Sequence, residues 1–200
     1  DIMHFHGPLP EEYDVVVERA YPAIDKLRDE GKVRFIGLSE RFTDDYKHKL
    51  ACKALRSHPG YWDVFMLKYG ILNQVAADEA LPLAKKHNVG ILNMAAVRIK
   101  LPNPRLLEEQ ILDWKERGLI GKDSVPDKDP LNWLVHDDVE SVVDAAYKFA
   151  ADHESVSTVI TGTANWEHLE SNVASLDNPK LSEIDAQRIR KLFGHIAEYA

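Results

Sequence analysis

The sequence predicts an α/β fold, in which a parallel sheet is assembled from repeated strand–helix units. Strand-like and helix-like segments alternate along all 200 residues. The first four predicted strands start roughly 30 residues apart, which is the spacing of stacked βα units. These strands are almost entirely apolar, as is typical of a sheet that is covered on both faces. We therefore expect a parallel sheet whose two faces are both buried.

The opening segment predicts the first strand and a candidate site. His4 and His6 lie two residues apart, so their side chains share one face of a strand. The Gly7-Pro8 pair breaks the strand directly after His6 and places that imidazole at its carboxyl end. Parallel α/β folds keep their chemistry at this end. Because the sequence starts within this strand, we expect the natural chain to begin upstream.

The rest of the chain divides into further helices and strands. Apolar residues at helical spacing from 13 to 27 predict the first helix, which Pro22 should kink and Gly31 should end. Thr43 should cap the second helix, and Pro104 suits the first position of a later one. The remaining strands are predicted at about 32–39, 62–69, 89–94 and 156–161, and the remaining helices at about 43–57, 76–87, 104–117, 139–151, from 163 or 165, and from 182.

The longest predicted loop covers residues 118–130. It combines glycine, serine, proline and charged residues, which punctuate chains rather than continue helices or strands. Loops of this length are either functional or plain connections. We treat this one as a candidate lid.

Composition and charge exclude several classes of protein. The chain is 44% hydrophobic with a formal net charge of −8, which fits one globular domain over residues 1–200 with a sizeable core. It has no dense run of Lys and Arg, so we expect no nucleic-acid partner. No apolar run approaches the ~20 residues that span a bilayer, so we expect no membrane partner. The single cysteine, Cys52, cannot form an intrachain disulfide, and we expect a reducing cytoplasm.

Five predicted strands fit two architectures. They can complete a small doubly wound open sheet, or they can be the later part of an eight-stranded barrel. Composition and pattern alone favour the open sheet, because most five-unit α/β chains of this size are complete open-sheet domains. No Gly-x-Gly-x-x-Gly motif follows any strand, which argues against a Rossmann-type dinucleotide site.

The spacing of His4 and His6 also suits a pair of metal ligands. A hydrolytic metal barrel then needs further His or Asp ligands at later strand ends. Those ends instead carry Ser39, Tyr69, Met94 and Thr161. We therefore predict no metal site, and either histidine taken alone is more typical of a hydrogen-bonded interior or rim residue.

The segment 161–165 joins the last predicted strand to a helix. Exposed backbone N–H groups at a helix start attract anions, and a phosphate site after the last strands recurs in barrels. Taken alone, the segment is more typical of an ordinary turn with an N-cap than of an anion site. It becomes informative only with a second signal.

That second signal is a resemblance spread along the chain. Residues 1–8 resemble a strand in which Asp and an apolar run end in His-x-Pro, and residues 28–39 resemble a helix end of Glu-Gly-Lys-Val-Arg followed by a strand ending in Gly-hydrophobic-Ser. Residues 159–163, followed by His168 and Asn172, resemble a last strand with a cofactor-phosphate helix. All three blocks are similar to the aldo-keto reductase family. The resemblance implies a (β/α)8 TIM barrel, here an N-terminally truncated portion with about five strands, from about the fourth barrel strand onward.

The resemblance implies a reaction as well as a fold. Family members transfer a hydride from NADPH to a small aldehyde or ketone, or oxidise a sugar or alcohol in reverse. His6 matches the family histidine that orients the carbonyl or assists the proton relay. The family's Asp, Tyr and Lys lie on earlier strands that precede residue 1. We therefore expect the full-length protein to be an enzyme and these 200 residues alone to be inactive.

The resemblance also implies where the cofactor binds. Ser39 matches the residue that helps to hold the nicotinamide amide, and Asn172 matches a residue near the adenine. Gly162 and Thr163 stand where many members have Lys-Ser, and His168 stands where an Arg commonly meets the 2′-phosphate. Loss of the Lys and the Arg removes charge-assisted phosphate contacts. We expect NADP as the cofactor, with NAD possible.

Three departures from the family pattern favour a second hypothesis. Glu40 replaces the usual Asn, Met66 the amide-binding Gln, and Met94 the aromatic residue that often stacks on nicotinamide. A thioether packs on a ring but offers less area. These changes favour a non-catalytic nucleotide-binding or subunit-type barrel protein, whereas the matching residues named above favour the enzyme.

Overall fold

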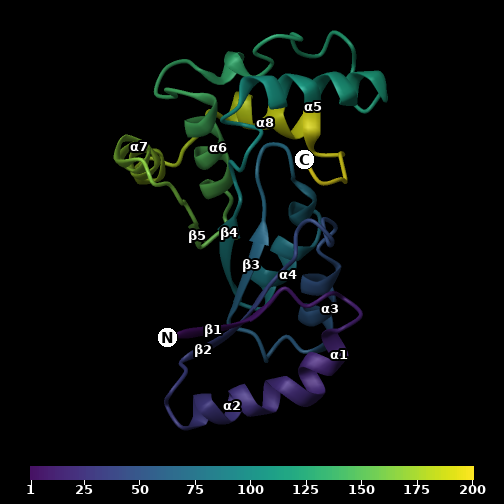
Figure 1. The fold of residues 1–200 in the computed structure, drawn as a ribbon, viewed down its shortest axis with the longest axis vertical. Helices are drawn as coiled ribbons and strands as arrows, with labels where there is room; N and C mark the ends of the chain where they lie inside the picture. The colour runs from purple at the N-terminus through teal and green to yellow at the C-terminus, as the bar shows by residue number, and fades with distance from the viewer.

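The computed structural model describes residues 1–200, and a five-stranded parallel sheet forms its centre (Figure 1). Its strand order, β1-β2-β3-β4-β5, follows the chain. The strands are β1 (Ile2–His6), β2 (Phe35–Ser39), β3 (Val64–Lys68), β4 (Gly90–Met94) and β5 (Thr158–Val159). The helices are α1 (Tyr13–Val15), α2 (Tyr21–Asp29), α3 (Lys49–Ser57), α4 (Ala80–Lys86), α5 (Pro104–Glu116), α6 (Val142–Ala151), α7 (Trp166–Asp177) and α8 (Glu183–Phe193).

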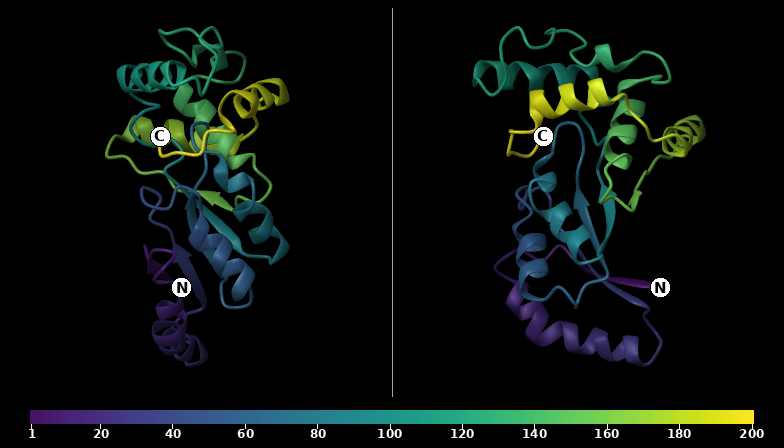
Figure 2. Two further views of the ribbon diagram at one scale, coloured as in Figure 1. Left: turned by 90° about the vertical axis from the view of Figure 1, so that its right-hand side faces the viewer. Right: turned by 180° about the vertical axis from the view of Figure 1, so that it is seen from behind.

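The strand order contradicts the doubly wound open sheet that composition alone favoured. A doubly wound sheet reverses its order at a switch point and carries helices on both faces. Here the order never reverses, and right-handed crossovers then place successive helices on the same face. Figure 2 shows helices along one side of the sheet and an uncovered opposite side. The progression matches a segment of a barrel.

Burial differs between the two faces of the sheet, except on the edge strand β1, where Met3 of the helix-covered face is 41% exposed. On the helix-covered face, side chains such as Ile36, Phe65 and Ile91 are fully buried. On the other face, Ile2 and Phe35 retain 42% and 41% of their surface. The prediction that both faces are buried is therefore wrong for this chain. A run of apolar residues in a strand indicates that both faces of the sheet are suited to burial. It does not show that helices are what covers each face.

The first helix contains a change of helix type near Pro22. A π-helical segment (Val16–Ala20) separates α1 from α2, and Pro22 lies in the first turn of α2. Proline cannot donate the hydrogen bond of a regular turn, and an interruption of the ladder in the preceding turn accommodates it. The predicted kink site is thus a π segment. Gly31, with φ of 72°, follows the end of α2 as predicted.

The start of α3 differs from the prediction. Thr43 does not cap it; the Thr43 hydroxyl donates to Asp44 instead. The carboxylate of Asp45 accepts hydrogen bonds from the backbone N–H groups of Lys49 and Leu50, at 3.0 and 2.8 Å. The helix therefore starts six residues after Thr43, and an Asp caps it from outside the first turn.

The later helix starts agree with the sequence. Pro104 begins α5 after the Asn103 cap, Asn165 caps α7, and Ser182 caps α8. Each cap accepts a hydrogen bond from a first-turn N–H group, which is the local chemistry that the sequence indicates. Several predicted elements are shorter in the structure than in the sequence analysis, among them the strands at 35–39, 64–68 and 158–159 and the helices at 80–86 and 142–151.

Residues 118–130 are anchored rather than free to close over a site. Lys115 Nζ donates to the Val125 carbonyl oxygen at 2.6 Å and to Asp127 at 2.6 Å. Ile120 and Val125 are buried. The segment lies beside α5 at one end of the molecule (Figure 1), so the structure does not support the lid.

No helix is both long and apolar enough to cross a bilayer.

Candidate functional site

The carboxyl ends of the strands form one continuous row. His6 on β1 is paired in register with Ser39 on β2, and Ser39 with Met66 on β3. Backbone hydrogen bonds extend the pairing past the strand ends, from Gly7 N–H to the Ser39 carbonyl (2.8 Å) and from Glu40 N–H to the Met66 carbonyl (2.9 Å). The sheet thus brings together two of the residues that the sequence selected.

The two histidines of the first strand have different surroundings. His6 is exposed at the strand end. His4 packs over Gly37 of β2, where a Cβ would lie 2.9 Å from the imidazole Cε1. Its Nδ1 is buried without a hydrogen-bond partner, and burial lowers the pKa of His4. His6 is therefore the more exposed of the two histidines, and His4 is a half-buried residue that packs on Gly37.

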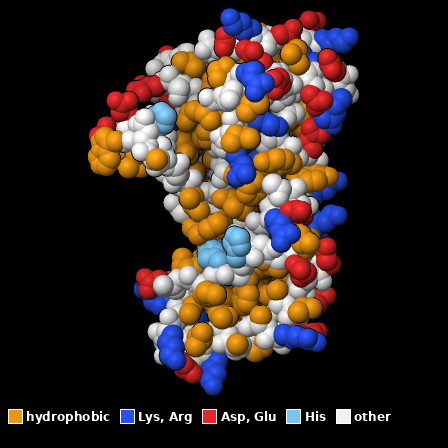
Figure 3. Space-filling model, in the orientation of Figure 1, with side chains coloured by type: hydrophobic (Ala, Val, Ile, Leu, Met, Phe, Trp, Pro, Cys, Tyr) orange, Lys and Arg blue, Asp and Glu red, His pale blue; other side chains and the backbone are white.

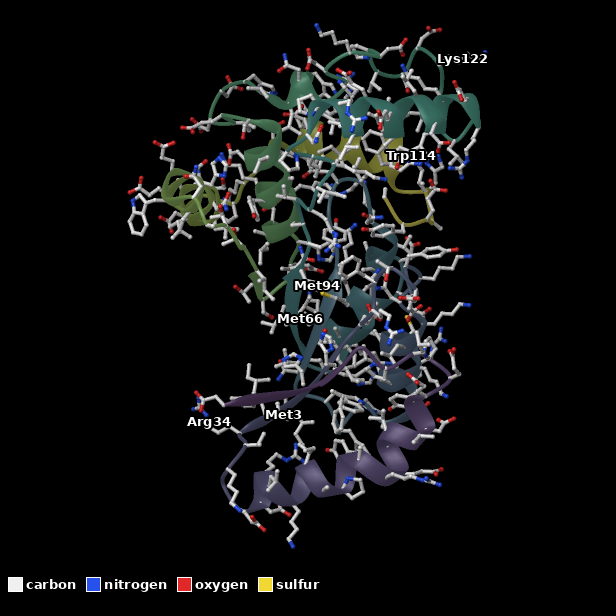
Figure 4. All side chains as sticks on the ribbon, in the orientation of Figure 1. Met3, Arg34, Met66, Met94, Trp114 and Lys122 are labelled. Carbon is white, nitrogen blue, oxygen red and sulfur yellow. The ribbon has the colours of Figure 1, made fainter.

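A cavity of about 710 Å³ opens beside the carboxyl ends of β4 and β5. Figure 3 shows a hollow on this side of the molecule, with histidine side chains at its lower margin. Met94 lines the cavity, and Figure 4 shows Met66 close to Met94 on the sheet. The cavity is lined by Phe42, Met94, Ala95, Ala96, Val97, Arg98, Pro102, Ser141, Val143, Tyr147, Ile160, Gly162, Thr163, His168, Ser171 and Asn172.

The structure divides the selected residues into two groups. Gly162, Thr163, His168 and Asn172 all line the cavity. His6 and Ser39 lie outside that lining, on the strand row, and Ser39 is buried. The two groups lie at the same end of the parallel sheet, where all five strands have their carboxyl ends. A ligand that touches both groups has to extend along this edge.

The start of α7 uses most of its own backbone donors. Asn165 Oδ1 accepts from the N–H groups of Glu167 and His168, at 2.8 and 3.2 Å. Thr163 Oγ1 accepts from the Asn165 N–H at 3.1 Å. The ordinary turn with an N-cap is therefore the observed state of this segment. An anion here has to interact chiefly with side chains rather than with an open ring of N–H groups.

Asn172 ties α7 to the segment that follows β5. Its Nδ2 donates to Thr161 Oγ1 at 2.7 Å, and the Tyr147 hydroxyl lies 2.9 Å from the same oxygen. Asn172 is buried. One side of its amide is thus committed to positioning α7 against the cavity wall, a role that the sequence did not indicate.

Glu40, which stands where the family usually has Asn, is buried and does not line the cavity. Its Oε2 lies 2.6 Å from His48 Nδ1, and its Oε1 accepts from the Ala51 N–H at 3.1 Å. Burial raises the pKa of Glu40, opposed by the neighbouring His48. This carboxylate holds the loop between β2 and α3. It is not placed to replace the Asn amide at a ligand.

Asn93 is a structural residue of the site that the sequence analysis missed. It is fully buried on β4. Its Oδ1 accepts from the Tyr69 N–H at 2.7 Å, and its Nδ2 donates to the Tyr69 carbonyl at 2.8 Å. These two bonds fix the backbone just past β3. The signal was a lone amide in the apolar strand 89–94, because buried amides need partners.

No group of three or more His, Cys, Asp or Glu side chains is arranged to hold a metal ion. His4 and His6 lack a third ligand near them. The site consists of a strand-end row, a cavity and the residues of α7.

A model of the Aldo/keto reductase family matches residues 1–193. The chain belongs to the aldo/keto reductase family. The α/β fold with its parallel sheet and the predicted family are thereby both confirmed.

Individual aldo/keto reductase relatives are distant. L-galactose dehydrogenase of Arabidopsis thaliana is 26% identical over 200 residues, covering 93% of this chain and 58% of the relative. NADH-specific methylglyoxal reductase of Escherichia coli (strain K12) is 23% identical over 212 residues, covering 96% and 58%.

A solved structure of the family has the same fold. Aldo-keto reductase AKR11C1 from Bacillus halodurans superposes with a TM-score of 0.67 at 21% identity, covering 100% of this chain and 62% of that one. At this identity the likeness shows the fold alone. The chain thus spans less than two thirds of the length of each of these aldo/keto reductases.

Proposed function

We propose that residues 1–200 form a single partial domain, the later portion of a (β/α)8 TIM barrel from about the fourth strand onward. The uncovered sheet face supports this. Ile2, Phe35 and Ile160 keep 42%, 41% and 42% of their surface exposed there, and a closed barrel encloses such side chains in its interior. β1 and β5 each have only one neighbouring strand, which leaves two edges for further strands.

We propose that the full-length protein is an NAD(P)H-dependent oxidoreductase. It reduces a small aldehyde or ketone, or oxidises a sugar or alcohol in reverse. The observation that carries the proposal is His6 at the carboxyl end of β1, in register with Ser39, in a chain of this family. Barrel enzymes place their chemistry at this edge.

The cavity beside α7 suits a dinucleotide. Its volume of about 710 Å³ lies within the range of ligand pockets, roughly 300–1,000 Å³. No Asp or Glu lines it, although the chain has a net charge of −8. This absence of acids favours an anionic ligand.

Five residues would hold the cofactor. Gly162, Thr163, His168 and Asn172 would contact its adenosine phosphate end, and Ser39 its nicotinamide amide. We propose NADP as the cofactor. NAD is the alternative, because Gly162 and His168 offer no permanent positive charge for the 2′-phosphate of NADP. The name of the Escherichia coli relative, an NADH-specific reductase, supports the alternative.

Bound NAD(P)H would supply the hydride. His6, exposed at the strand end, would orient the substrate carbonyl by a hydrogen bond and assist the movement of a proton to its oxygen. The hydrogen-bonded row of strand ends fixes His6 relative to Ser39. The proton-donating Tyr and its Asp and Lys partners are proposed to lie on barrel strands outside these residues.

A non-catalytic nucleotide-binding barrel remains the second candidate. Met66 and Met94 favour it, because neither reproduces the amide or the aromatic ring of an active family member. Glu40 does not add to this case, since its carboxylate is occupied by His48 and Ala51.

We also propose a reducing compartment such as the cytoplasm, since Cys52 is a buried free thiol.

The test is turnover by the full-length protein. NADPH and NADH oxidation should be followed with a panel of small aldehydes, ketones and sugars. We expect turnover with at least one cofactor and one carbonyl. Dinucleotide binding without turnover on any member of the panel would favour the non-catalytic alternative.

A further inference from the structure

A buried pair of side chains joins the two ends of the loop between β2 and α3. Glu40 directly follows Ser39, and His48 directly precedes α3. Glu40 Oε2 lies 2.6 Å from His48 Nδ1, and Glu40 Oε1 accepts from the Ala51 N–H at 3.1 Å. The two side chains expose only 1% and 4% of their surface. Residues 40–48 thus form a loop that is closed by a contact shielded from water.

Polar contacts, rather than apolar packing, hold this loop. Its buried members are Glu40, Asp45 and His48, and none of its apolar side chains is buried. The backbone hydrogen bonds of residues 41–47 stay within the loop, such as the one from the Asp45 N–H to the Arg41 carbonyl oxygen at 2.8 Å. Buried polar groups need partners. The loop therefore keeps its place through the Glu40–His48 contact and through Asp45, which accepts from the first turn of α3.

The loop 40–48 lies between the two groups of site residues. Arg41 packs over the turn that follows His6, since a Cβ at Gly7 would lie 3.8 Å from Arg41 Nε. Phe42, the next residue, lines the large cavity. It is the only lining residue that precedes β4 in the chain. The loop thus connects the strand-end row with the cavity, along the path that a ligand of both groups has to follow.

Phe42 forms the wall on this side of the cavity. Its ring is half-buried, and the Arg98 guanidinium lies 4.8 Å from the ring centroid. Arg98 belongs to the loop after β4 and lines the same cavity. The Tyr199 ring lies 5.9 Å away. Contacts with Arg98 and Tyr199 orient the aromatic ring, whereas the loop 40–48 determines where its backbone lies.

The backbone of His48 is strained. Its φ is 55°, a conformation that residues other than glycine adopt mainly where their surroundings impose it. The contact with Glu40 is the buried interaction that its side chain makes here. Gly and Asn adopt this conformation readily, and an Asn amide nitrogen takes nearly the place of an imidazole Nδ1. This position therefore accepts substitutions that keep or remove the contact on the same backbone.

We propose that Glu40 and His48 are positioning residues for the cofactor, which hold the loop 40–48 so that Phe42 packs against the nicotinamide half of the bound dinucleotide. The inference rests on the proposed function. The nicotinamide half is the end expected here, because Ser39, the residue proposed to hold the nicotinamide amide, lies three residues before Phe42. Glu40 thus acts on the cofactor through the loop and not through a contact of its own.

The test is a double-mutant cycle in the full-length protein, read as the Kd of NADPH and of NADH in fluorescence titrations. His48→Gly removes the contact with Glu40 and suits the left-handed backbone. It should raise the Kd of the preferred dinucleotide at least ~10-fold, and Phe42→Ala should do the same. The variant with both substitutions should bind no more weakly than Phe42→Ala alone, because the buried pair acts through that ring.

His48→Asn is the matched control. Asn also adopts a positive φ, and its Nδ2 can donate to Glu40 in place of the imidazole. The Kd should then stay within ~3-fold of the wild-type value. In both His48 variants kcat at saturating cofactor should change by less than ~3-fold, since this residue is remote from the reacting atoms. Glu40→Leu breaks the same contact without leaving a buried charge, and takes the place of His48→Gly in the cycle if the latter does not fold.

Three results would overturn the positioning role. They are an unchanged Kd in either single variant, losses that multiply in the double variant, and an equal loss in His48→Asn. Dinucleotide binding without turnover of any carbonyl would count against the reductase function and leave the coupling between His48 and Phe42 as measured. Wild-type protein that binds neither dinucleotide would overturn both.

Discussion

His6 and Ser39 occupy paired positions at the carboxyl ends of β1 and β2, and the next amide along, Gly7 N–H, donates to the Ser39 carbonyl at 2.8 Å. This pairing fixes an exposed imidazole next to a buried serine. The backbone, not the two side chains, maintains their spacing. Substitution of the imidazole should therefore leave the strand ends in place.

His6→Ala in the full-length protein should lower kcat by ~10²-fold or more with little change in cofactor affinity, because the imidazole acts on the carbonyl rather than on the dinucleotide. Steady-state kinetics and a cofactor titration measure the two quantities. His87→Ala, on the loop between α4 and β4, serves as the matched control. Turnover at the wild-type rate in His6→Ala would remove this residue from the mechanism.

Preference for NADPH over NADH should be below ~100-fold, since His168 and Gly162 stand where many family members have Arg and Lys. His168→Arg should raise the preference by about 10-fold, by adding a charge-assisted contact to the 2′-phosphate. Fluorescence titrations with both dinucleotides test this. A wild-type preference far above 100-fold would mean that another group binds the phosphate.

Gly37→Ala should destabilise the protein by about 1–3 kcal/mol through overpacking. A Cβ at Gly37 would lie 2.6 Å from the Val64 carbonyl oxygen and 2.9 Å from His4 Cε1. Gly60→Ala is the control, because nothing lies within 4 Å of its Cβ position. Denaturant unfolding of both variants measures their free energies of unfolding. If Gly37→Ala were as stable as Gly60→Ala, His4 and β3 would have to move aside at no cost.

Lys68 should make stability depend on pH. Its pKa falls from 10.5 to about 7 on folding, so the unfolded chain binds more protons between these values and the stability of the folded protein rises with pH there. Arg98 and Lys100 are the charged groups that oppose its protonation. Lys68→Met removes the loss of folded-state stability that this lowered pKa causes, which is fully present below pH 7.

Unfolding curves of wild type and Lys68→Met at several pH values measure this effect. The stability difference should favour the variant most below pH 7 and shrink by up to about 1.4 kcal/mol per pH unit above it. Lys122→Gln should show a difference that does not vary with pH. A flat difference for Lys68→Met as well would mean that this amine titrates normally.

Local chemistry made several elements predictable. Asn165 and Ser182 cap helices with side chains that act on the next few residues, so neighbouring sequence is sufficient. Thr43 failed as a cap because Asp45 is also a good cap, and the choice depends on the buried contact between Glu40 and His48. That contact joins the end of β2 to the start of α3 and cannot be read from helix signals alone.

Long-range features were less predictable. Apolar strands indicate two dry faces, but they do not distinguish a second helical layer from a barrel interior. Asn172 was selected by family resemblance, yet its bond to Thr161 depends on how α7 folds back. Lys68 gave no signal, because a lysine at a strand end is ordinarily solvated and only the packing of Phe42 and Tyr199 around it makes it unusual.

The most direct test of the central claim follows the hydride itself. The full-length protein should be incubated with an aldehyde and NADPH or NADH carrying deuterium at the transferred position of the nicotinamide, and the alcohol product analysed by mass spectrometry. We predict one deuterium on the carbinol carbon per cofactor oxidised. An unlabelled alcohol, or no alcohol with either cofactor, would contradict the assignment of this chain to a carbonyl-reducing enzyme.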